Sequence, residues 1–260
     1  MKPIVLADDF AVGRYAAEII FSEMVRAATE NRPFVLGCPG GRTPRSAYKG
    51  LADLIKESKT NISHVIIAMM DEFLEENTDG TYSNHTLDKH FSCTRFAKLE
   101  IFDVLNASAP EGGKIALENV RFPDASDPQS YEDFLRKVGV DVFLMASGAS
   151  DGHVAFNPPG TKRDECTRIV RIADETRHDN LSTFPDFKYI EEVPKHGVSV
   201  GPATMVDVSA IAIMELIGTH KAEAFARISA ATSYESDWPS TIIRDCKDYY
   251  ILADKAAANS

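Results

Sequence analysis

The chain has 260 residues, of which 44% are hydrophobic and 26% charged, a balance typical of a globular protein long enough to bury a full core. Its formal net charge of -11 argues against a nucleic-acid surface, because phosphate backbones are held by dense lysine and arginine patches. No apolar run approaches the roughly 18 residues of a membrane-spanning helix. The short stretch before Asp8 is also unlike a signal peptide. We therefore expect one domain over residues 1–260, in the cytoplasm, with no membrane partner.

The four cysteines are far apart and form no CxxC pair, so the sequence signals neither a zinc site nor a disulfide framework. A reducing compartment is the simplest expectation.

Short apolar runs alternate with helical stretches along the chain, which is the pattern of an α/β protein. Nearly continuous apolar runs predict strands at residues 3–7, 33–38, 64–70, 142–146, 210–216 and 249–253. Amphipathic spacing predicts helices at residues 10–29, 45–58 and 131–138, and one that begins near Lys221 and ends at residue 229.

Three stretches show no clear hydrophobic periodicity. Residues 74–82 are polar and turn-rich and are expected to be mobile, with a short helix opening at Ser83. Residues 107–127 are expected to be a surface connection. Residues 161–192 are charged and irregular, which is typical either of a flap over the site or of a solvated face.

A glycine turn follows the second predicted strand, with the sequence Pro-Gly-Gly-Arg-Thr-Pro at residues 39–44. Thr43 is a natural N-cap and Pro44 a natural first residue of the next helix. A strand, a glycine turn and a helix N-terminus together form an anion site, to which Arg42 adds a cation. The alternative is an ordinary turn that needs glycine for its dihedral angles. The turn matches neither the Walker pattern nor GxGxxG, so no nucleotide is implied.

Two further strands end in acidic residues. Asp71 follows the third strand, where it is either close to a substrate or capping a local turn. Asp151 and His153 lie in a glycine-flanked loop after the strand at 142–146, where they form either an acid–base pair or a common surface turn. Lys221 follows the strand at 210–216 and lies in the first turn of a helix, where a cation opposes the dipole and therefore points to an anionic ligand. The carboxyl ends of four strands thus deliver candidate site residues to one edge of the sheet.

These motifs resemble those of the glucosamine-6-phosphate deaminase/isomerase family, which is related in fold to the 6-phosphogluconolactonases. The resemblance covers nearly the whole chain and is carried by residues 40–44, 70–73, 151–157, 193–194 with 198–201, and 220–222. The sequence Ala-Phe-Asn at residues 155–157 is typical of the deaminases, whereas lactonases usually continue with Ala-Ser-Leu-Phe-Pro.

The resemblance implies a three-layer α/β/α sandwich with a mostly parallel, modified Rossmann-like sheet, and a phosphorylated amino sugar as substrate. It implies that Asp71 is the base that moves a proton between carbon-2 and carbon-1, and that His153, oriented by Asp151, opens the sugar ring. It assigns the phosphate to Gly40, Gly41, Arg42, Thr43 and Lys221. No metal and no cofactor is required. A homo-oligomer is compatible with the sequence, which leaves the number of subunits and any allosteric site open.

Two positions depart from the family pattern. The deaminases usually carry a glutamate after Ala-Phe-Asn, where this chain has Pro158. They also carry a phosphate-binding arginine where this chain has Thr183. Arg42 is a candidate for the missing positive charge, and Asp151 or a neighbouring carboxylate from Asp164 or Glu165 is a candidate for the missing carboxylate.

Three functions are therefore considered. The first is an amino-sugar-phosphate deaminase or aldose–ketose isomerase, expected to be a hydrolase of carbohydrate metabolism. The second is a phosphosugar lactonase that uses His153 to activate water. The third is a sugar-phosphate sensor without catalysis, which is suggested by Pro158 alone. The sequence does not choose the hexosamine-6-phosphate or other sugar phosphate.

Overall fold

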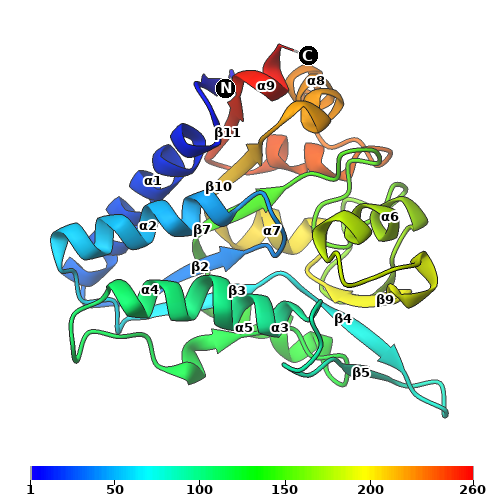
Figure 1. The fold of residues 1–260 in the computed structure, drawn as a ribbon, viewed down its shortest axis with the longest axis horizontal. Helices are drawn as coiled ribbons and strands as arrows, with labels where there is room; N and C mark the ends of the chain where they lie inside the picture. The colour runs from blue at the N-terminus through cyan, green and yellow to red at the C-terminus, as the bar shows by residue number, and fades with distance from the viewer. Residues whose placement is uncertain (1, 260) are drawn as a thin grey trace.

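The computed structural model describes residues 2–259. Its centre is a seven-stranded sheet in the order β1-β11-β10-β7-β2-β3-β6, in which every neighbouring pair is parallel (Figure 1). The strands are β1 (Ile4–Leu6), β2 (Phe34–Cys38), β3 (Val65–Met69), β6 (Val120–Arg121), β7 (Val140–Ala146), β10 (Ser209–Leu216) and β11 (Tyr249–Asp254). The six predicted strands are confirmed.

Helices cover both faces of this sheet, as the predicted three-layer sandwich requires. Along β2, Leu36 packs into one core with α1 and α2, whereas its neighbour Val35 packs into a second core with α5 and α7. Strands buried on both faces are nearly continuous in hydrophobicity, and all five residues of β2 are buried. The first layer contains α1 (Asp9–Thr29) and α2 (Arg45–Ser58). It also contains a continuous helical segment that consists of α3 (Cys93–Phe96), a π-helical stretch (Ala97–Phe102) and α4 (Asp103–Ser108). The second layer contains α5 (Pro128–Val138), α7 (Pro202–Val208) and α8 (Ala222–Ala230).

A second, four-stranded antiparallel sheet lies beside the first and was not predicted (Figure 1). Its order is β5-β4-β9-β8, with β4 (Asp71–Glu76), β5 (Tyr82–Asn84), β8 (Arg168–Arg171) and β9 (His196–Ser199). The chain passes directly from β3 into β4 through Met70, which bonds to both sheets: its N–H donates to Cys38 O at 3.1 Å, and its carbonyl accepts from Val200 N at 2.8 Å.

The prediction of a helix opening at Ser83 is wrong. Residues 74–84 form a β-hairpin, because Asn77 N donates to Thr81 O at 2.8 Å and Gly80 takes the left-handed φ of 81° that closes such a turn. The residues expected to form a polar mobile segment are therefore the ends of β4 and β5 with the turn between them.

Several other local predictions need correction. Thr43 is not the N-cap of α2. Pro44 occupies that position, and no side chain there hydrogen-bonds to the first turn of the helix. Lys221 ends a 3-10 turn, Thr219–Lys221, directly before α8 rather than lying inside that helix. Two other stretches contain elements that were not predicted: the expected surface connection at 107–127 includes β6, and the stretch at 161–192, expected to be a flap or a solvated face, contains β8 and α6 (Asp174–Thr183). The remaining described elements are α9 (Lys255–Ala258) and the 3-10 turns Leu117–Asn119, Ile190–Glu192 and Pro239–Asp245.

Strands β10, β7, β2 and β3 are consecutive in the sheet, so their carboxyl ends meet at one edge. From β2 the chain continues outward through β3, and from β7 it continues in the opposite direction through β10 and β11. Ligands bind in α/β sheets at such a switch point. Among the helices of residues 2–259, none is long and apolar enough to cross a membrane.

Candidate active site

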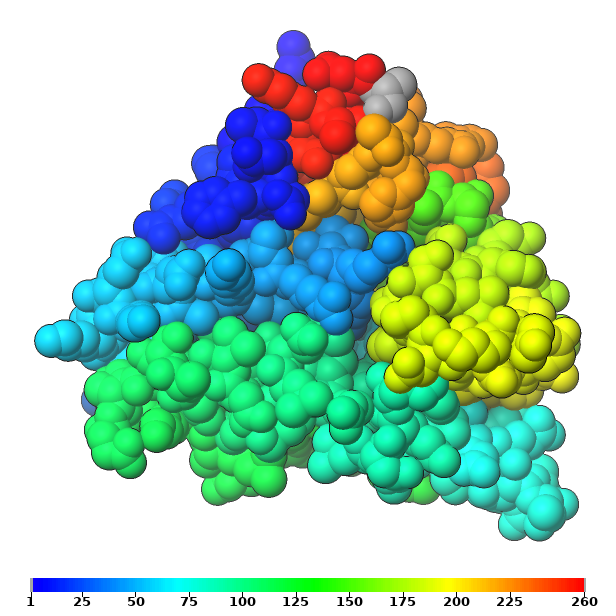
Figure 2. Space-filling view, in the orientation of Figure 1, coloured from blue at the N-terminus to red at the C-terminus, as the bar shows by residue number. Residues whose placement is uncertain are grey.

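A cavity of about 490 Å³ opens at this edge of the sheet. The ends of β2, β3, β7 and β10 reach it, and α6 closes one side. Figure 2 shows the yellow-green surface of α6 and the loop after it beside the blue surface that follows β2. Seven of the eight predicted site residues line the cavity: Gly40, Gly41, Arg42, Thr43, Asp71, His153 and Lys221. The eighth, Asp151, lies behind His153 and bonds to it.

Asp151 and His153 form a tight pair. His153 Nδ1 lies 2.7 Å from Asp151 Oδ1, and the Thr176 hydroxyl donates to Asp151 Oδ2 at 2.8 Å. Burial by itself would raise the pKa of Asp151, but the hydrogen bond and positive charge of His153 outweigh it and lower this pKa to about 2. Because a carboxylate only accepts hydrogen bonds, the Nδ1 of His153 carries the proton of this bond and Nε2 remains for a ligand.

Two glycines make this loop geometry possible. A Cβ on Gly148 would lie 2.3 Å from both Asp151 Oδ1 and His153 Nδ1. Gly152 has a φ of 65°, and a Cβ there would lie 2.3 Å from the Trp238 ring. The positions of the acid and the imidazole therefore depend on two residues without side chains, Gly148 before the pair and Gly152 between its members.

Asp71 faces the cavity from the start of β4 and is 6% exposed. Burial raises the pKa of its carboxyl to about 7, although the Cys93 thiol, which donates to Oδ1 at 3.3 Å, works in the opposite direction. Burial also raises the pKa of the adjacent Glu72, but its carboxylate does not line the cavity and accepts hydrogen bonds from Ser92, Cys93 and Thr94 at the start of α3. Asp71 is therefore the carboxyl of this pair that faces the cavity with a perturbed pKa, as is common for acid–base groups.

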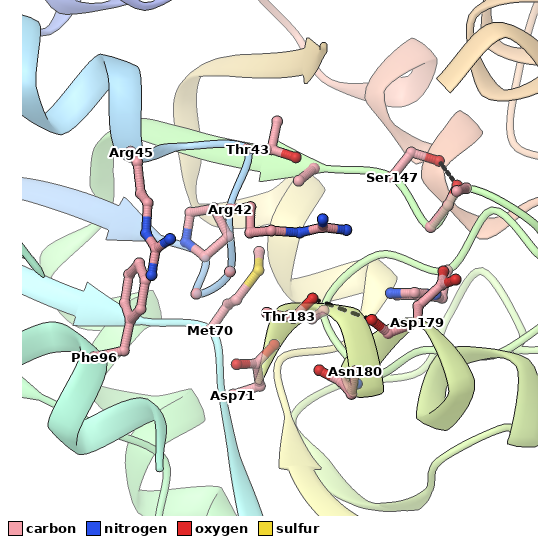
Figure 3. A pocket seen from close by; sticks show the side chains of 18 of the residues that line it. Arg42, Thr43, Arg45, Met70, Asp71, Phe96, Ser147, Asp179, Asn180 and Thr183 are labelled. Atoms are coloured by element: carbon pink, nitrogen blue, oxygen red, sulfur yellow. Dashed lines mark hydrogen bonds between the residues drawn. The ribbon is translucent and has the colours of Figure 1, made fainter. Parts of the chain in front are cut away.

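Positive charge gathers at the β2 end of the cavity. The Arg42 side chain extends into the cavity, whereas Arg45 turns toward Phe96 and pairs with Glu100 at 3.3 Å (Figure 3). Among residues 2–259, Arg42 has no acidic partner within 4 Å. Lys221 is 8% exposed and donates to the Ser147 carbonyl; burial lowers the pKa of its ammonium group to about 8.

The N-terminus of α2 adds donors to the same region. Ser46, in its first turn, lines the cavity, and its buried hydroxyl has no hydrogen-bond partner within the described part of the chain. Gly41 supports this turn with a φ of 90°. Free backbone N–H groups, an unpaired hydroxyl and two cations form an arrangement suited to a phosphate.

The sequence did not predict the helix α6, although the flap expected within residues 161–192 and the departure at Thr183 both fall on it. Thr176, Asp179 and Thr183 recur at spacings of three and four, so they share one face of the helix, and this face meets the site. That periodicity of polar residues was the available signal. Thr183, where the family resemblance implies an arginine, lines the cavity and donates to the Asp179 carbonyl at 3.2 Å.

Of the candidates for the missing carboxylate, Asp151 bonds to His153 at 2.7 Å, whereas Asp164 and Glu165 do not line the cavity. Pro158 is also absent from the lining. Pro158 accepts a hydrogen bond from Thr161 N at 3.1 Å, and the Glu165 carboxylate is paired with Arg168. Arg42, the candidate for the missing positive charge, does line the cavity.

Within residues 2–259, one group of three His, Cys, Asp or Glu side chains is close enough to share a metal ion. It consists of Asp151, His153 and Asp179, whose nearest ligand atoms lie within 4.8 Å of one another. Clusters of this kind also occur without a metal, and the Asp151–His153 hydrogen bond already uses one atom of each.

The chain has clear relatives among known proteins. Residues 7–251 match the family model described as glucosamine-6-phosphate isomerases/6-phosphogluconolactonase. A glucosamine-6-phosphate deaminase from Exiguobacterium sp. (strain ATCC BAA-1283 / AT1b) is 30% identical over 251 residues, which cover 94% of this chain and 87% of that protein.

Solved structures show the same fold. A monomeric glucosamine-6-phosphate deaminase is similar with a TM-score of 0.82 at 22% identity, covering 100% of this chain and 99% of that chain. A 6-phosphogluconolactonase from Leishmania guyanensis is similar with a TM-score of 0.68 at 18% identity, covering 100% and 98%. Because the family model matches nearly the whole chain, the protein belongs to the glucosamine-6-phosphate isomerase/6-phosphogluconolactonase family.

Proposed function

We propose that this protein is an amino-sugar-phosphate deaminase/isomerase, which converts a hexosamine-6-phosphate to a ketose phosphate and ammonia. The observation that carries the proposal is that two separate acid–base groups, Asp71 and the Asp151–His153 pair, meet in one cavity that has a cationic end. The family and the deaminase relative support the same activity.

The reaction assigns a different task to each group. His153 gives a proton to the ring oxygen through Nε2 and takes one from the carbon-1 hydroxyl, which opens the ring. Asp71 then removes the proton from carbon-2 and returns it to carbon-1, while a proton of the substrate's ammonium group passes to the carbon-1 oxygen, which leaves a hydroxyl at carbon-1 and an iminium at carbon-2. Water adds to carbon-2, the carbon–nitrogen bond breaks, and ammonia leaves with the ketose phosphate as the other product.

The pKa of Asp71 suits this task. A base is most effective when its pKa lies near the working pH, and burial raises the pKa of this carboxyl to about 7. The base is therefore stronger than an exposed aspartate while being ionised in a large fraction of molecules near neutrality.

The cationic end of the cavity is proposed to hold the substrate phosphate. Arg42 and Lys221 supply charge, and the turn formed by Gly40, Gly41 and Thr43 with the N-terminus of α2 supplies donors. Asp71 lines the same cavity as this cationic end, so one substrate can contact both.

A phosphosugar lactonase is the second candidate, because the family includes 6-phosphogluconolactonases. That reaction needs His153 to activate water and gives Asp71 no task. A buried, perturbed carboxyl in the cavity therefore favours the deaminase.

A panel of phosphorylated sugars separates these candidates. Glucosamine-6-phosphate, galactosamine-6-phosphate and 6-phosphogluconolactone would each be incubated with the protein, with ammonia, ketose and acid measured as products. We expect ammonia and ketose in equal amounts from at least one hexosamine phosphate. Acid formed from the lactone alone would favour the second candidate, and binding without any product would favour a sensor.

A further inference from the structure

Cys93 contacts Asp71, the base of the proposed reaction, yet that reaction gives the Cys93 thiol no role. Its Sγ lies 3.3 Å from Asp71 Oδ1, to which the thiol donates a hydrogen bond. Cys93 is 4% exposed and lines the cavity together with Asp71. The turn after β2 packs against the same thiol, because a Cβ on Gly40 would lie 4.0 Å from Sγ. The thiol is therefore part of the cavity wall beside the carboxylate.

The backbone that carries Cys93 is fixed by the residue next to Asp71. The Glu72 carboxylate accepts hydrogen bonds from the N–H groups of Cys93 at 2.9 Å and Thr94 at 2.7 Å. Glu72 is fully buried and adjoins Asp71 in β4. The N-terminus of α3 is thus tied to β4 at the position of the base, which leaves the Cys93 side chain little freedom to move away from it.

The hydrogen bond from Cys93 is the one that the Asp71 carboxylate makes within residues 2–259, where it also has no ion pair within 4 Å. Burial raises the pKa of the Cys93 thiol well above its ordinary value, so the thiol stays protonated and acts as a donor rather than as a nucleophile. Because Oδ1 accepts from Cys93, Oδ2 is the oxygen that remains for a substrate.

A thiol suits this position because it is a weak donor. A hydrogen bond to an ionised carboxylate lowers its pKa, and a weak donor lowers it little. Burial is the largest effect on Asp71 and keeps its pKa at about 7 in spite of the thiol. A cation in the same place would also orient the carboxylate, but it would make Asp71 a weaker base.

Other titratable and charged groups surround Asp71 or share its cavity. They are the adjacent Glu72 in β4, His153 in the loop after β7, the cavity cations Arg42 and Lys221, and the buried phenols of Tyr48 and Tyr131. Glu72 raises the pKa of Asp71 and His153 lowers it. All of these groups are present in the parent and in any variant of Cys93, so their effects cancel when the two are compared.

We propose that Cys93 is a positioning residue for the base: its thiol fixes one oxygen of the Asp71 carboxylate, so that the other oxygen is presented to carbon-2 of the substrate. The part that concerns carbon-2 rests on the proposed function. The orientation of Asp71 by Cys93 does not, because it follows from the contact between the thiol and the carboxylate.

Cys93→Ala and Cys93→Ser separate this role from a merely structural one. Cys93→Ala removes the donor, so the acid limb of the kcat/KM profile, where Asp71 becomes protonated, should move to higher pH by about half a unit. Its kcat should fall about tenfold, because the carboxylate is no longer fixed in one orientation, while its affinity for inorganic phosphate should stay within about twofold of the parent. Cys93→Ser keeps a donor, so it should restore most of kcat and return the acid limb to the pH of the parent or below it.

Cys246→Ala is the matched control for the loss of a buried thiol. Cys246 is 5% exposed, its thiol donates to the Ile242 carbonyl, and it does not line the cavity. Its kcat and its acid limb should be those of the parent.

The S–H stretching band of Cys93 gives a readout that needs no substrate. The infrared frequency of this band falls as the hydrogen bond donated by the thiol becomes stronger, and an ionised carboxylate is a stronger acceptor than a protonated one. One S–H band of the parent should therefore shift to lower frequency as the pH rises through about 7, where Asp71 ionises. This shift should be absent in Asp71→Asn, and the band itself should be absent in Cys93→Ala. The other three cysteine thiols donate to backbone carbonyls and should show no such shift.

Parent S–H bands that do not respond to pH would overturn the inference, and this result does not depend on whether a variant of Cys93 folds. An acid limb that is unchanged in Cys93→Ala would also overturn it, as would equal losses of kcat in Cys93→Ala and Cys93→Ser. Phosphate binding that weakens in parallel with kcat would show that Cys93 is merely structural. If the parent converts no hexosamine phosphate, the proposed function fails, while the infrared titration still decides whether Cys93 orients Asp71.

Discussion

Asp71→Asn should make the protein more stable and inactive at the same time. In the folded protein burial raises the pKa of Asp71 from 3.8 to about 7. A difference of roughly three pKa units is worth about 4 kcal/mol between the protonation states. Above pH 7 the buried carboxylate is ionised in the folded and unfolded states alike, so the folded protein bears this whole cost. Asparagine keeps the shape of the side chain and removes the cost.

The size of this stability difference depends on pH, and its sign does not. Because the folded-state pKa is raised, this group destabilises the parent fully above about pH 7 and not at all below about pH 4. We expect Asp71→Asn to exceed the parent in free energy of unfolding by roughly 2–4 kcal/mol at pH 8 and by about 1–2 kcal/mol at pH 5. Other buried acids, such as Glu215, are present in both proteins and cancel in the difference.

Urea unfolding of both proteins at the two pH values measures this difference, with Asp186→Asn as an exposed control that should change stability by less than about 0.5 kcal/mol. Asp71→Asn should lose turnover of the hexosamine phosphate, because the amide cannot accept the proton from carbon-2. The affinity of this variant for inorganic phosphate should stay within about threefold of the parent, because the cationic end of the cavity is intact. A variant that is less stable than the parent at pH 8, or that turns over at the parent rate, would refute the reasoning.

Three further substitutions test the other parts of the site. Lys221→Met should weaken binding of the phosphorylated sugar by about 1.5–3 kcal/mol in isothermal titration, because a charge-assisted contact to the phosphate is lost. The affinity for the dephosphorylated sugar should not change. Equal losses of affinity for both ligands would place Lys221 outside the phosphate site. His153→Gln should slow a closed-ring substrate much more than an open-chain one, and equal slowing would exclude ring opening as its task. Burial raises the pKa of Glu215 to about 8, and its carboxylate has no hydrogen-bond partner within the described residues. Glu215→Gln should therefore stabilise the protein, as measured by urea unfolding, by roughly 1–2 kcal/mol more at pH 8 than at pH 6. A gain in stability that does not depend on pH would contradict this.

The sequence by itself determined the central sheet and the strand ends that carry most of the site. In a strand such as residues 34–38, the side chains that point to either face of the sheet are apolar, because helices cover both faces. Neighbouring residues in the sequence are enough to recognise this pattern. Asp71, His153 and Lys221 follow such runs, and the carboxyl ends of neighbouring parallel strands share one edge. Their convergence therefore followed from chain order and strand direction alone.

Only the tertiary structure revealed the second sheet and the contribution of α6. β4 pairs with β9, more than a hundred residues later, and most residues of the hairpin at 74–84 are exposed, so no local hydrophobic pattern marks it. The pKa of Asp71 likewise depends on burial and on Cys93, which α3 brings to it, and the meeting of Asp179 with His153 depends on how α6 packs against the loop after β7. Charge interactions and burial act through space between residues distant in sequence, so they are decided only when the chain is folded.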